Sequence, residues 1–442
     1  MPTLRPALRV AGIVIPFLLG LAALAGSLPN PFPAGCVITR VLPNGLRIVV
    51  REDHSLPIVS LVVVVRGGSG AGDAPGAAHY LEHLTLQGTK RYPDRLAPQL
   101  ALEKVGGVSN AVTSRDMTRY QATVESSQAG LLVDVLADVA TGALLDDESF
   151  ARERPTVLAE IQGMTDDPQA LLLNLGYQFS YRAHPYRARP TGAIEDVLRL
   201  TADDVRACYR RRYLPNNMSV VLVGDITSLQ AFKLVEAAFG GVKAAALPDW
   251  PPAEPAGRET VEGHVPMDID STYQVLAFPA PPVSDLHGVA AADLLMTLLA
   301  SNGDGLLLDR WTKDGIQVYD FGAEFVSARG PGRLLVWALT KPEKAGKLRT
   351  STLGLFSALA ANPVPAEALA RAKERLATDL LMENETYSQQ ASTLAFYEGL
   401  NGAITLTRYI PAVEALTAAQ LRAAVPTRPL TWITLGHRPE EK

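Results

Sequence analysis

Apolar residues along the chain fall into short β-type runs separated by longer helical patterns. The segment from Ile58 to Val65 is a β-branched and aliphatic run, which indicates a strand in the middle of a sheet. The stretch 37–65 is predicted to contain two strands, with a turn at residues 41–45. Similar short runs predict later strands at residues 219–223, 273–278 and 431–435.

Helical patterns occupy most of the sequence between these strands. Five glycines between Gly67 and Gly76 form a loop, and a helix is expected from about Ala77. Periodic apolar positions predict further helices over residues 94–105, 128–142, 147–163, 168–180, 201–212, 227–239, 287–300, 343–361 and 365–383.

Prolines interrupt the pattern between residues 244 and 263, at positions 248, 251, 252 and 255. They are too many for a helix or a central strand, so this stretch is interpreted as an interdomain linker. We expect a first domain at 37–245, a linker at 246–262 and a second domain at 263–442. Both halves begin with strands, continue with helices and end on a strand that stops at a glycine, so both are predicted to be α/β.

The composition agrees with two globular domains. The chain has 442 residues, more than one ordinary core accommodates. Hydrophobic residues make up 47% and charged residues 20%, which excludes the disordered class. The formal net charge is −5 with both signs interspersed, so no basic surface for nucleic acid is expected.

The first residues have the pattern of an export signal. Arg5 and Arg9 precede an apolar run from Val10 to Gly26, and residues 23–25 read small-x-small. A signal peptide is therefore predicted over 1–25, with export to the bacterial periplasm. The alternative is an uncleaved anchor, although the run is short for a membrane span of about 20 residues.

Cysteine usage is sparse. Cys36 and Cys208 are the two cysteines of the chain, so a disulfide framework does not hold this fold together, and the pair either bonds or stays free. Lipidation of Cys36 is disfavoured because Pro33 stands where such a signal requires an aliphatic residue. A membrane is a partner only if the N-terminal segment is retained or Cys36 is lipidated.

Three residues of the helix after the glycine loop have the spacing of a metal site. His79, Glu82 and His83 fall at i, i+3 and i+4, so they project from one face and both imidazoles can reach one metal ion. Glu82 is then the candidate general base. The alternative is a solvent-facing helix with polar pairs, but the flanking Leu81 and Leu84 favour a packed helix.

A hydrolytic zinc site takes three protein ligands and keeps a fourth position for water, so a third ligand must come from elsewhere in the chain. The acidic helix at 147–163 offers Glu148, Glu153 and Glu160, and spacing alone does not choose among them. Glu153 and Glu160 are two turns apart, so one can bind the metal while the other supports it. Pro155 lies between them and weakens any argument from strict periodicity.

At these residues the sequence resembles the pitrilysin/insulinase family of inverted-motif zinc peptidases, which includes insulin-degrading enzyme and the mitochondrial processing peptidase. The resemblance implies an α/β (α+β) fold of two similar domains, each a mainly antiparallel sheet backed by helices. It extends over nearly the whole chain after the signal and rests on residues 79–83 (HYLEH), 42–46, 88–93, 106–111, 184–186 and 215–218.

The resemblance also implies the remaining parts of the site. One Zn²⁺ per chain is expected, with Glu160 as the third ligand and Glu153 as the supporting glutamate. Asn110 and Ala111 are expected on a strand edge beside the metal, where an extended peptide binds by strand addition. An alternative for Asn110 is a turn residue after the glycines at 106–107.

One feature of the family pattern is missing. Family members carry an Arg and a Tyr seven residues apart that hold the substrate, but alignment on Gly315 places Trp311 and Val318 there. Arg310 and Tyr319 are each one residue out of place, and a slip of one residue in a strand turns a side chain to the opposite face. We therefore expect a heterodimer with a homologous subunit that lacks the zinc motif and supplies the Arg/Tyr pair.

Together these features predict a zinc-dependent endopeptidase that cleaves short or unfolded peptides, with its zinc-binding catalytic domain at 37–245. A non-catalytic scaffold subunit of the same fold is one alternative, and a module that binds peptides without cutting them is another. A purely structural zinc site is not expected, because such sites are usually closed by four ligands rich in cysteine.

Overall fold

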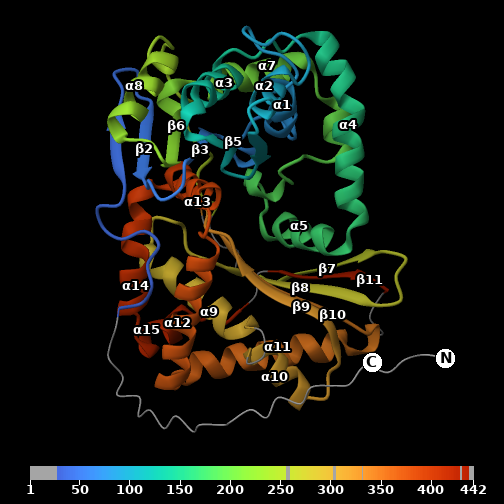
Figure 1. The fold of residues 1–442 in the computed structure, drawn as a ribbon. Coiled ribbons are helices and arrows are strands. Elements are labelled where there is room, and N and C mark those ends of the chain that lie inside the picture. Colours follow the sequence, from blue (N-terminus) through green and yellow to red (C-terminus); the bar gives the residue numbers. More distant parts are fainter. Residues whose placement is uncertain (1–26, 255–258, 302–304, 331, 429–430, 438–442) are drawn as a thin grey trace, which may run out of the picture.

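The chain folds into two halves, each built on one sheet backed by helices (Figure 1). The computed structural model describes residues 27–254, 259–301, 305–330, 332–428 and 431–437. The expected signal peptide at 1–25 lies outside these ranges. Within them, no single helix is long and apolar enough to cross a membrane, and one bent pair, Pro342–Ala361 with Ala366–Met382, passes by length and composition only.

The first sheet has six strands in the order β1-β2-β6-β3-β5-β4, and all neighbours are antiparallel except β2 and β6. The prediction of two strands over 37–65 is wrong, because this stretch forms three. Gly45, at φ 86°, turns the chain into a second strand before the predicted apolar run begins. The strands are β1 (Ile38–Val41), β2 (Arg47–Glu52), β3 (Ile58–Arg66), β4 (Val108–Thr113), β5 (Met117–Glu125) and β6 (Met218–Gly224).

The second sheet repeats this topology. Its order is β7-β11-β8-β10-β9, again with one parallel pair, β7 and β11, followed by antiparallel neighbours. The strands are β7 (Val261–Pro266), β8 (Thr272–Pro279), β9 (Val318–Phe325), β10 (Arg333–Thr340) and β11 (Thr431–Gly436). The order matches β2-β6-β3-β5-β4 position by position, so the predicted fold class of two similar, mainly antiparallel halves is confirmed.

Helices cover both sheets, and each predicted helix is present within a few residues of its expected bounds. Those of the first half are α1 (Ala77–Thr85), α2 (Ala97–Glu103), α3 (Ala129–Thr141), α4 (Asp147–Asp166), α5 (Pro168–Ser180), α6 (Ile194–Arg199), α7 (Ala202–Arg212) and α8 (Ser228–Phe239). Those of the second half are α9 (Leu286–Ala300), α10 (Leu306–Lys313), α11 (Ala345–Ala361), α12 (Ala366–Met382), α13 (Tyr387–Leu400), α14 (Tyr409–Ala415) and α15 (Ala418–Ala424).

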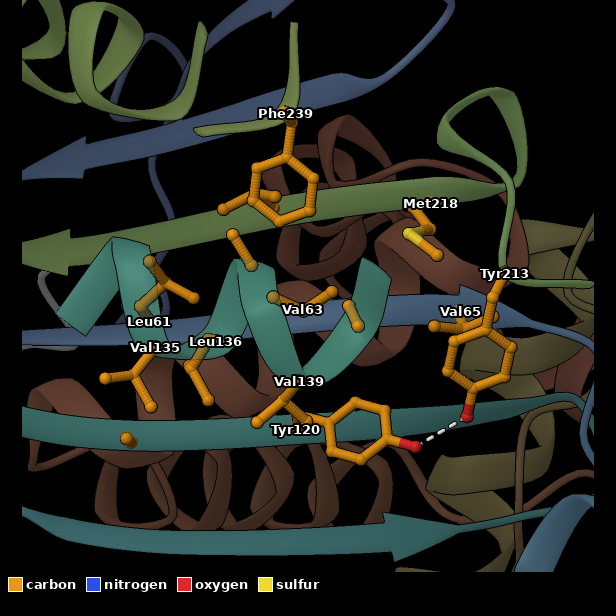
Figure 2. Packing of buried hydrophobic residues seen from close by; sticks show 14 of the residues in the cluster. Leu61, Val63, Val65, Tyr120, Val135, Leu136, Val139, Tyr213, Met218 and Phe239 are labelled. Atoms are coloured by element: carbon orange, nitrogen blue, oxygen red, sulfur yellow. Dashed lines mark hydrogen bonds between the residues drawn. The ribbon is translucent and has the colours of Figure 1, made fainter. Parts of the chain in front are cut away.

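The first core lies between helix α3 and one face of the first sheet (Figure 2). Tyr120 and Tyr213 also lie in this core, and their hydroxyls meet at 2.5 Å, so neither buried phenol lacks a partner. Alternate residues of β3 face α3 in the way that a period of two requires. The packed side chains include Leu61, Val63, Val65, Val135, Leu136 and Val139.

The other face of each sheet is covered by a helix from the opposite half (Figure 1). Helix α13 lies against β3 and β6 of the first sheet, where Leu394 packs in one cluster with Val62. Helix α5 lies against β8 and β11 of the second sheet, where Leu172 packs in one cluster with Val275. Because each half completes the core of the other, the two halves are expected to fold as one cooperative unit.

A buried carboxylate also joins the halves. Glu398 of α13 is 1% exposed and accepts hydrogen bonds from Arg47 at 2.6 Å and Arg66 at 3.1 Å. Ser219 and the backbone N–H of Ala403 donate to the same carboxylate. Every oxygen of this buried charge therefore has partners, which is the condition under which such a group is tolerated.

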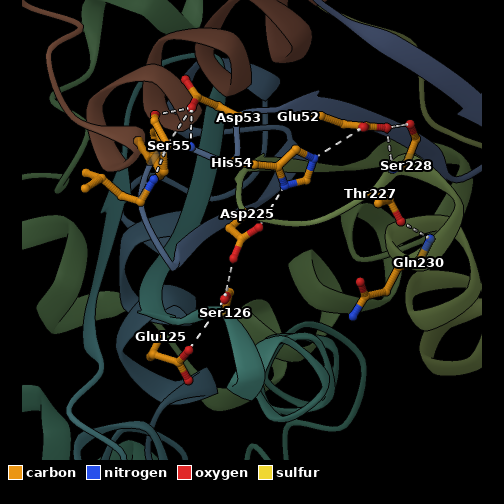
Figure 3. Close-up of polar contacts among 12 residues, drawn as sticks. Glu52, Asp53, His54, Ser55, Glu125, Ser126, Asp225, Thr227, Ser228 and Gln230 are labelled. Carbon is orange, nitrogen blue, oxygen red and sulfur yellow. Dashed lines mark hydrogen bonds and ion pairs between the residues drawn. The ribbon is translucent and has the colours of Figure 1, made fainter.

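Polar residues also tie together the strand ends of the first sheet (Figure 3). His54 Nδ1 lies 2.7 Å from Asp225 Oδ1, and Ser126 donates to the other oxygen of Asp225. The Tyr387 hydroxyl of α13 donates to Asp53 at 2.6 Å, so this cluster also contacts the second half. Ser126 bonds the carboxylate of Asp225 and not the imidazole, so Ser126 and His54 do not form a pair of nucleophile and base.

The two cysteines are free thiols. Cys208 is buried in α7, and burial raises the pKa of its thiol to about 12. It is therefore protonated at neutral pH and acts as an apolar core residue.

Replacing Leu394 by Ala tests the packing between the halves. Leu394 is fully buried in α13, so the substitution should lower the free energy of unfolding by about 2–5 kcal/mol. Urea unfolding followed by circular dichroism should still show one transition, because the damaged contact belongs to both halves. Leu229→Ala, at a position 64% exposed, is the matched control and should change stability by less than about 0.5 kcal/mol. Two separate transitions would contradict the cooperative unit.

Candidate metal centre

Helix α1 packs against the core with one side, and its other side carries the two histidines of the candidate metal centre. It begins after Gly76, whose φ is 82°, and a Cβ there would lie 3.2 Å from the carbonyl oxygen of Thr191. Glycine is therefore required both by the left-handed backbone and by the close approach. Tyr80 and Leu81 are fully buried, and they anchor the helix in the first core.

An aromatic contact helps to hold helix α4 against α1. The ring of Tyr80 stacks on Phe150 with centroids 4.7 Å apart, and its hydroxyl donates to the Phe150 carbonyl at 2.5 Å. The side chain of Asp146 accepts from the backbone N–H of Ser149 and caps the start of α4. The helix continues past Pro155 for about three further turns, to Asp166, so this proline does not end it.

Two imidazoles and one carboxylate converge where these helices face each other. His79 Nε2 lies 3.3 Å from one oxygen of Glu160, and His83 Nε2 lies 3.2 Å from the other. One ligand atom from each of the three residues lies within 4.8 Å of the other two. Ligand atoms about 2.0–2.2 Å from a tetrahedral zinc ion stand about 3.3–3.6 Å apart, and the two measured nitrogen–oxygen distances are close to this range.

The three candidate carboxylates of α4 have different surroundings. Glu153 is buried, and its Oε1 lies 3.1 Å from His83 Nδ1. This contact favours the tautomer that leaves His83 Nε2 free as a ligand, which is the usual task of a carboxylate behind a metal-binding histidine. Glu148 is 87% exposed and pairs with Arg152, away from the histidines. Of the three, Glu160 is therefore the one whose oxygens reach both imidazoles.

The carboxylate of Glu160, which lies between the two imidazoles, favours binding of a cation. Hydrogen bonds from His79 and then from His83 hold the pKa of Glu160 well below its usual range. Burial lowers the pKa of His83, but its hydrogen bonds to Glu153 and Glu160 outweigh burial and raise the pKa to about 9. A metal ion must displace the imidazole proton, so metal affinity should depend on pH.

Glu82 lies beside this group but is not a member of it. Its side chain is 8% exposed, and burial raises the pKa of the carboxyl, against the lowering effect of a hydrogen bond from Thr113. Thr113 Oγ1 donates to Glu82 Oε2 at 2.5 Å. Thr113 was not predicted from the sequence, although it lies two residues after Ala111 and a strand would place both side chains on one face.

A cleft of about 270 Å³ opens beside the metal group. Glu82 and His83 form part of its wall, and Asn110 and Ala111 of β4 line it as well. Asn110 lies opposite Gln121 in the sheet, so the alternative interpretation of Asn110 as a turn residue is wrong. Strand β4 is at the edge of its sheet, which leaves backbone groups on its open side available for another extended chain. The apolar floor of the cleft comes from Leu86, Leu102, Val135, Leu136 and Val139.

The residues at and next to the positions of the family's Arg/Tyr pair do not reach the cleft. Trp311 is fully buried and its indole N–H donates to Thr352, so this side chain belongs to the second core. Arg310 is held by Asp314 at 2.7 Å, and Tyr319 is 47% exposed. Neither Arg310 nor Tyr319 lines the cleft beside the metal group.

Comparison with known families agrees with this arrangement. Residues 47–190 match the family model described as insulinase (peptidase family M16), and residues 199–376 match the model described as the peptidase M16 inactive domain. The chain belongs to peptidase family M16. The metal group falls within the first match, and the second match covers most of the half that carries no part of it.

Individual relatives of this M16 chain extend the comparison. An uncharacterised zinc protease of Streptomyces coelicolor is 35% identical over 234 residues, 51% of this chain and 50% of the relative. A probable mitochondrial-processing peptidase subunit beta of Arabidopsis thaliana is 29% identical over 205 residues, 46% of this chain and 38% of that protein. The matches thus span about half of the first relative and less of the second.

A solved structure covers nearly the whole chain. The crystal structure of a protease from Helicobacter pylori superimposes with a TM-score of 0.85 and 24% identity, over 93% of this chain and 100% of that one. This likeness shows that the fold of both halves is shared.

Replacing Glu153 by Gln tests the support of the metal group. The amide keeps the size of the side chain but removes the negative charge behind His83, so zinc affinity should fall by about 10- to 100-fold. Competition with a chelating dye measures this affinity directly. Glu148→Gln, on the exposed face of the same helix, should leave affinity unchanged. Equal affinities for the two variants would contradict the supporting role.

Proposed function

We propose that the chain is a zinc-dependent endopeptidase that cleaves short or unfolded peptides. The observation that carries the proposal is the convergence of His79, His83 and Glu160 beside a cleft whose wall contains His83 and Glu82. Membership of a zinc peptidase family supports the same activity.

Each residue of the site has a separate task. A zinc ion held by His79, His83 and Glu160 would lower the pKa of a water and polarise the peptide carbonyl. Glu82 accepts the proton of the attacking water and later passes it to the leaving amine. Glu153 orients His83 and keeps its Nε2 directed at the metal position.

The open edge of β4 supports a preference for extended substrates. A peptide that pairs with Asn110 and Ala111 would run along the cleft beside Glu82. Strand addition needs several residues in β conformation with free backbone groups, which a folded protein rarely presents. Short or unfolded peptides meet this requirement. Export to the periplasm would bring the enzyme to such peptides.

We further propose that a homologous subunit completes the active site. Trp311, which stands at the position of the family's Arg, is packed in the core. The neighbouring Arg310 is bound by Asp314. This chain therefore does not itself provide the family's Arg at this position. A relative that is named as a subunit of a processing peptidase supports an assembly of this kind. If no such partner exists, a protein that binds peptides without cutting them is the second candidate, because metal ligation does not require the Arg/Tyr pair.

Substitutions at the metal group should separate binding from chemistry. Glu82→Gln should retain zinc and lose about 10²- to 10⁴-fold in kcat, because the general base is absent. His79→Ala should lose the zinc itself, because two ligands remain. Metal analysis and cleavage of a quenched peptide distinguish the two outcomes. Normal turnover by zinc-loaded Glu82→Gln would exclude the proposed mechanism.

The need for a partner can be measured on the purified chain. We expect the chain alone to bind one zinc ion and to cleave a quenched peptide slowly, and a co-purified homologous subunit to raise kcat at least about tenfold. Size-exclusion chromatography with light scattering shows which species is active. Full turnover by the isolated chain, unchanged on adding the subunit, would exclude the heterodimer.

A further inference from the structure

Thr113 stands at the end of strand β4 with its hydroxyl on the carboxylate of Glu82. It is 9% exposed, and its Oγ1 donates to Glu82 Oε2 at 2.5 Å. Thr118 lies directly opposite in β5, with its Oγ1 3.1 Å from that of Thr113. A hydroxyl carries one proton. Because Thr113 donates its proton to Glu82, the donor in the contact between Thr113 and Thr118 must be Thr118. The two hydroxyls therefore form a one-way chain that ends on the carboxylate.

We infer that Thr113 is a positioning residue for the general base, with Thr118 fixing the direction of its hydroxyl. The inference rests on the proposed role of Glu82. Thr113 holds Oε2 of Glu82, whereas Oε1 has no hydrogen-bond partner among the described residues. Because Glu82 lines the cleft, Oε1 is the oxygen available to a reacting water.

This restraint matters because a glutamate side chain is flexible. A free Glu82 could adopt several rotamers, and few of them place a carboxylate oxygen within hydrogen-bond reach of the attacking water. A hydrogen bond from a hydroxyl to a carboxylate is shorter and stronger than one between neutral groups. The contact with Thr113 therefore selects one position of the base before a substrate arrives.

Strand β4 also relates the base to the substrate. Ala111 and Thr113 lie two residues apart, so their side chains share the face of β4 that looks toward α1. The peptide is proposed to pair with the same strand at Asn110 and Ala111. Strand β4 would thus position both the peptide, through Asn110 and Ala111, and the carboxylate of Glu82, through Thr113. No flexible segment separates these residues of the strand.

Thr113→Val removes the hydroxyl and keeps the shape. We expect kcat to fall by about 10- to 100-fold while KM changes by less than about twofold, because the substrate contacts remain. The zinc content should equal that of the wild type. Thr113→Ser restores the hydroxyl and should recover kcat to within about threefold of the wild type. A wild-type kcat in Thr113→Val, or an equal loss in both variants, would overturn the inference.

A second hydroxyl pair in the same sheet provides the control. Ser60 and Thr123 contact each other at 2.8 Å across β3 and β5 and do not touch Glu82. Thr123→Val should therefore lose a cross-strand bond of the same kind without changing kcat. A loss as large as that of Thr113→Val would mean that sheet packing, and not the position of Glu82, controls the rate.

A crystal structure of zinc-loaded Thr113→Val tests the inference without any activity. Glu82 should leave its wild-type position or divide between two rotamers, and an unmoved carboxylate would overturn the inference. If both wild type and variant bind zinc but cleave no peptide, the proposed function fails, and the position of Glu82 still decides the role of Thr113.

Discussion

The contact between α1 and α4 is the constraint on which the metal centre depends. The histidines and Glu160 lie about eighty residues apart in the chain, and Tyr80 helps to bring their helices together, because it stacks on Phe150 and donates to its carbonyl. A second carboxylate lies close to the point where α1 and α4 meet. Glu153 is more buried than Glu160 on the same helix and contacts the second nitrogen of His83, so in the proposed metal centre one helix would supply both a ligand and the group that orients another ligand.

The second half supports the fold around the candidate metal centre, although none of its described residues belongs to the group His79, His83 and Glu160. Its helix α13 covers the face of the first sheet opposite the metal, and Glu398 joins this helix to the strands through two arginines. Strand β9 occupies the place in the second sheet that β4 occupies in the first, but among the described residues no cluster of possible metal ligands lies in the second half. The repeated topology therefore serves two purposes: one copy carries the candidate metal centre, and the other covers the second face of its sheet.

The sequence predicted the parts of the site that lie close together in the chain. The spacing of His79, Glu82 and His83 fixes them on one helical face, and the helix is present. The third ligand was not determined by spacing, because seven residues separate Glu153 from Glu160 and burial, which the sequence does not show, distinguishes them. Thr113 escaped prediction because its role depends on a contact between strand β4 and helix α1. The predicted turn at 41–45 is present, but the number of strands was too low, because the chain forms the short strand Arg47–Glu52 between this turn and the apolar run.

The absence of the Arg/Tyr pair follows from packing and cannot be repaired by a small shift. In helix α10 one residue corresponds to a rotation of about 100°, so Arg310 points to Asp314 while Trp311 points into the core. In strand β9 one residue reverses the face, so Tyr319 is exposed where Val318 packs inward. Bringing Arg310 inward would expel an indole whose N–H is already satisfied by Thr352. The packing of the second half thus opposes a shift that would bring Arg310 and Tyr319 to the positions of the family pair.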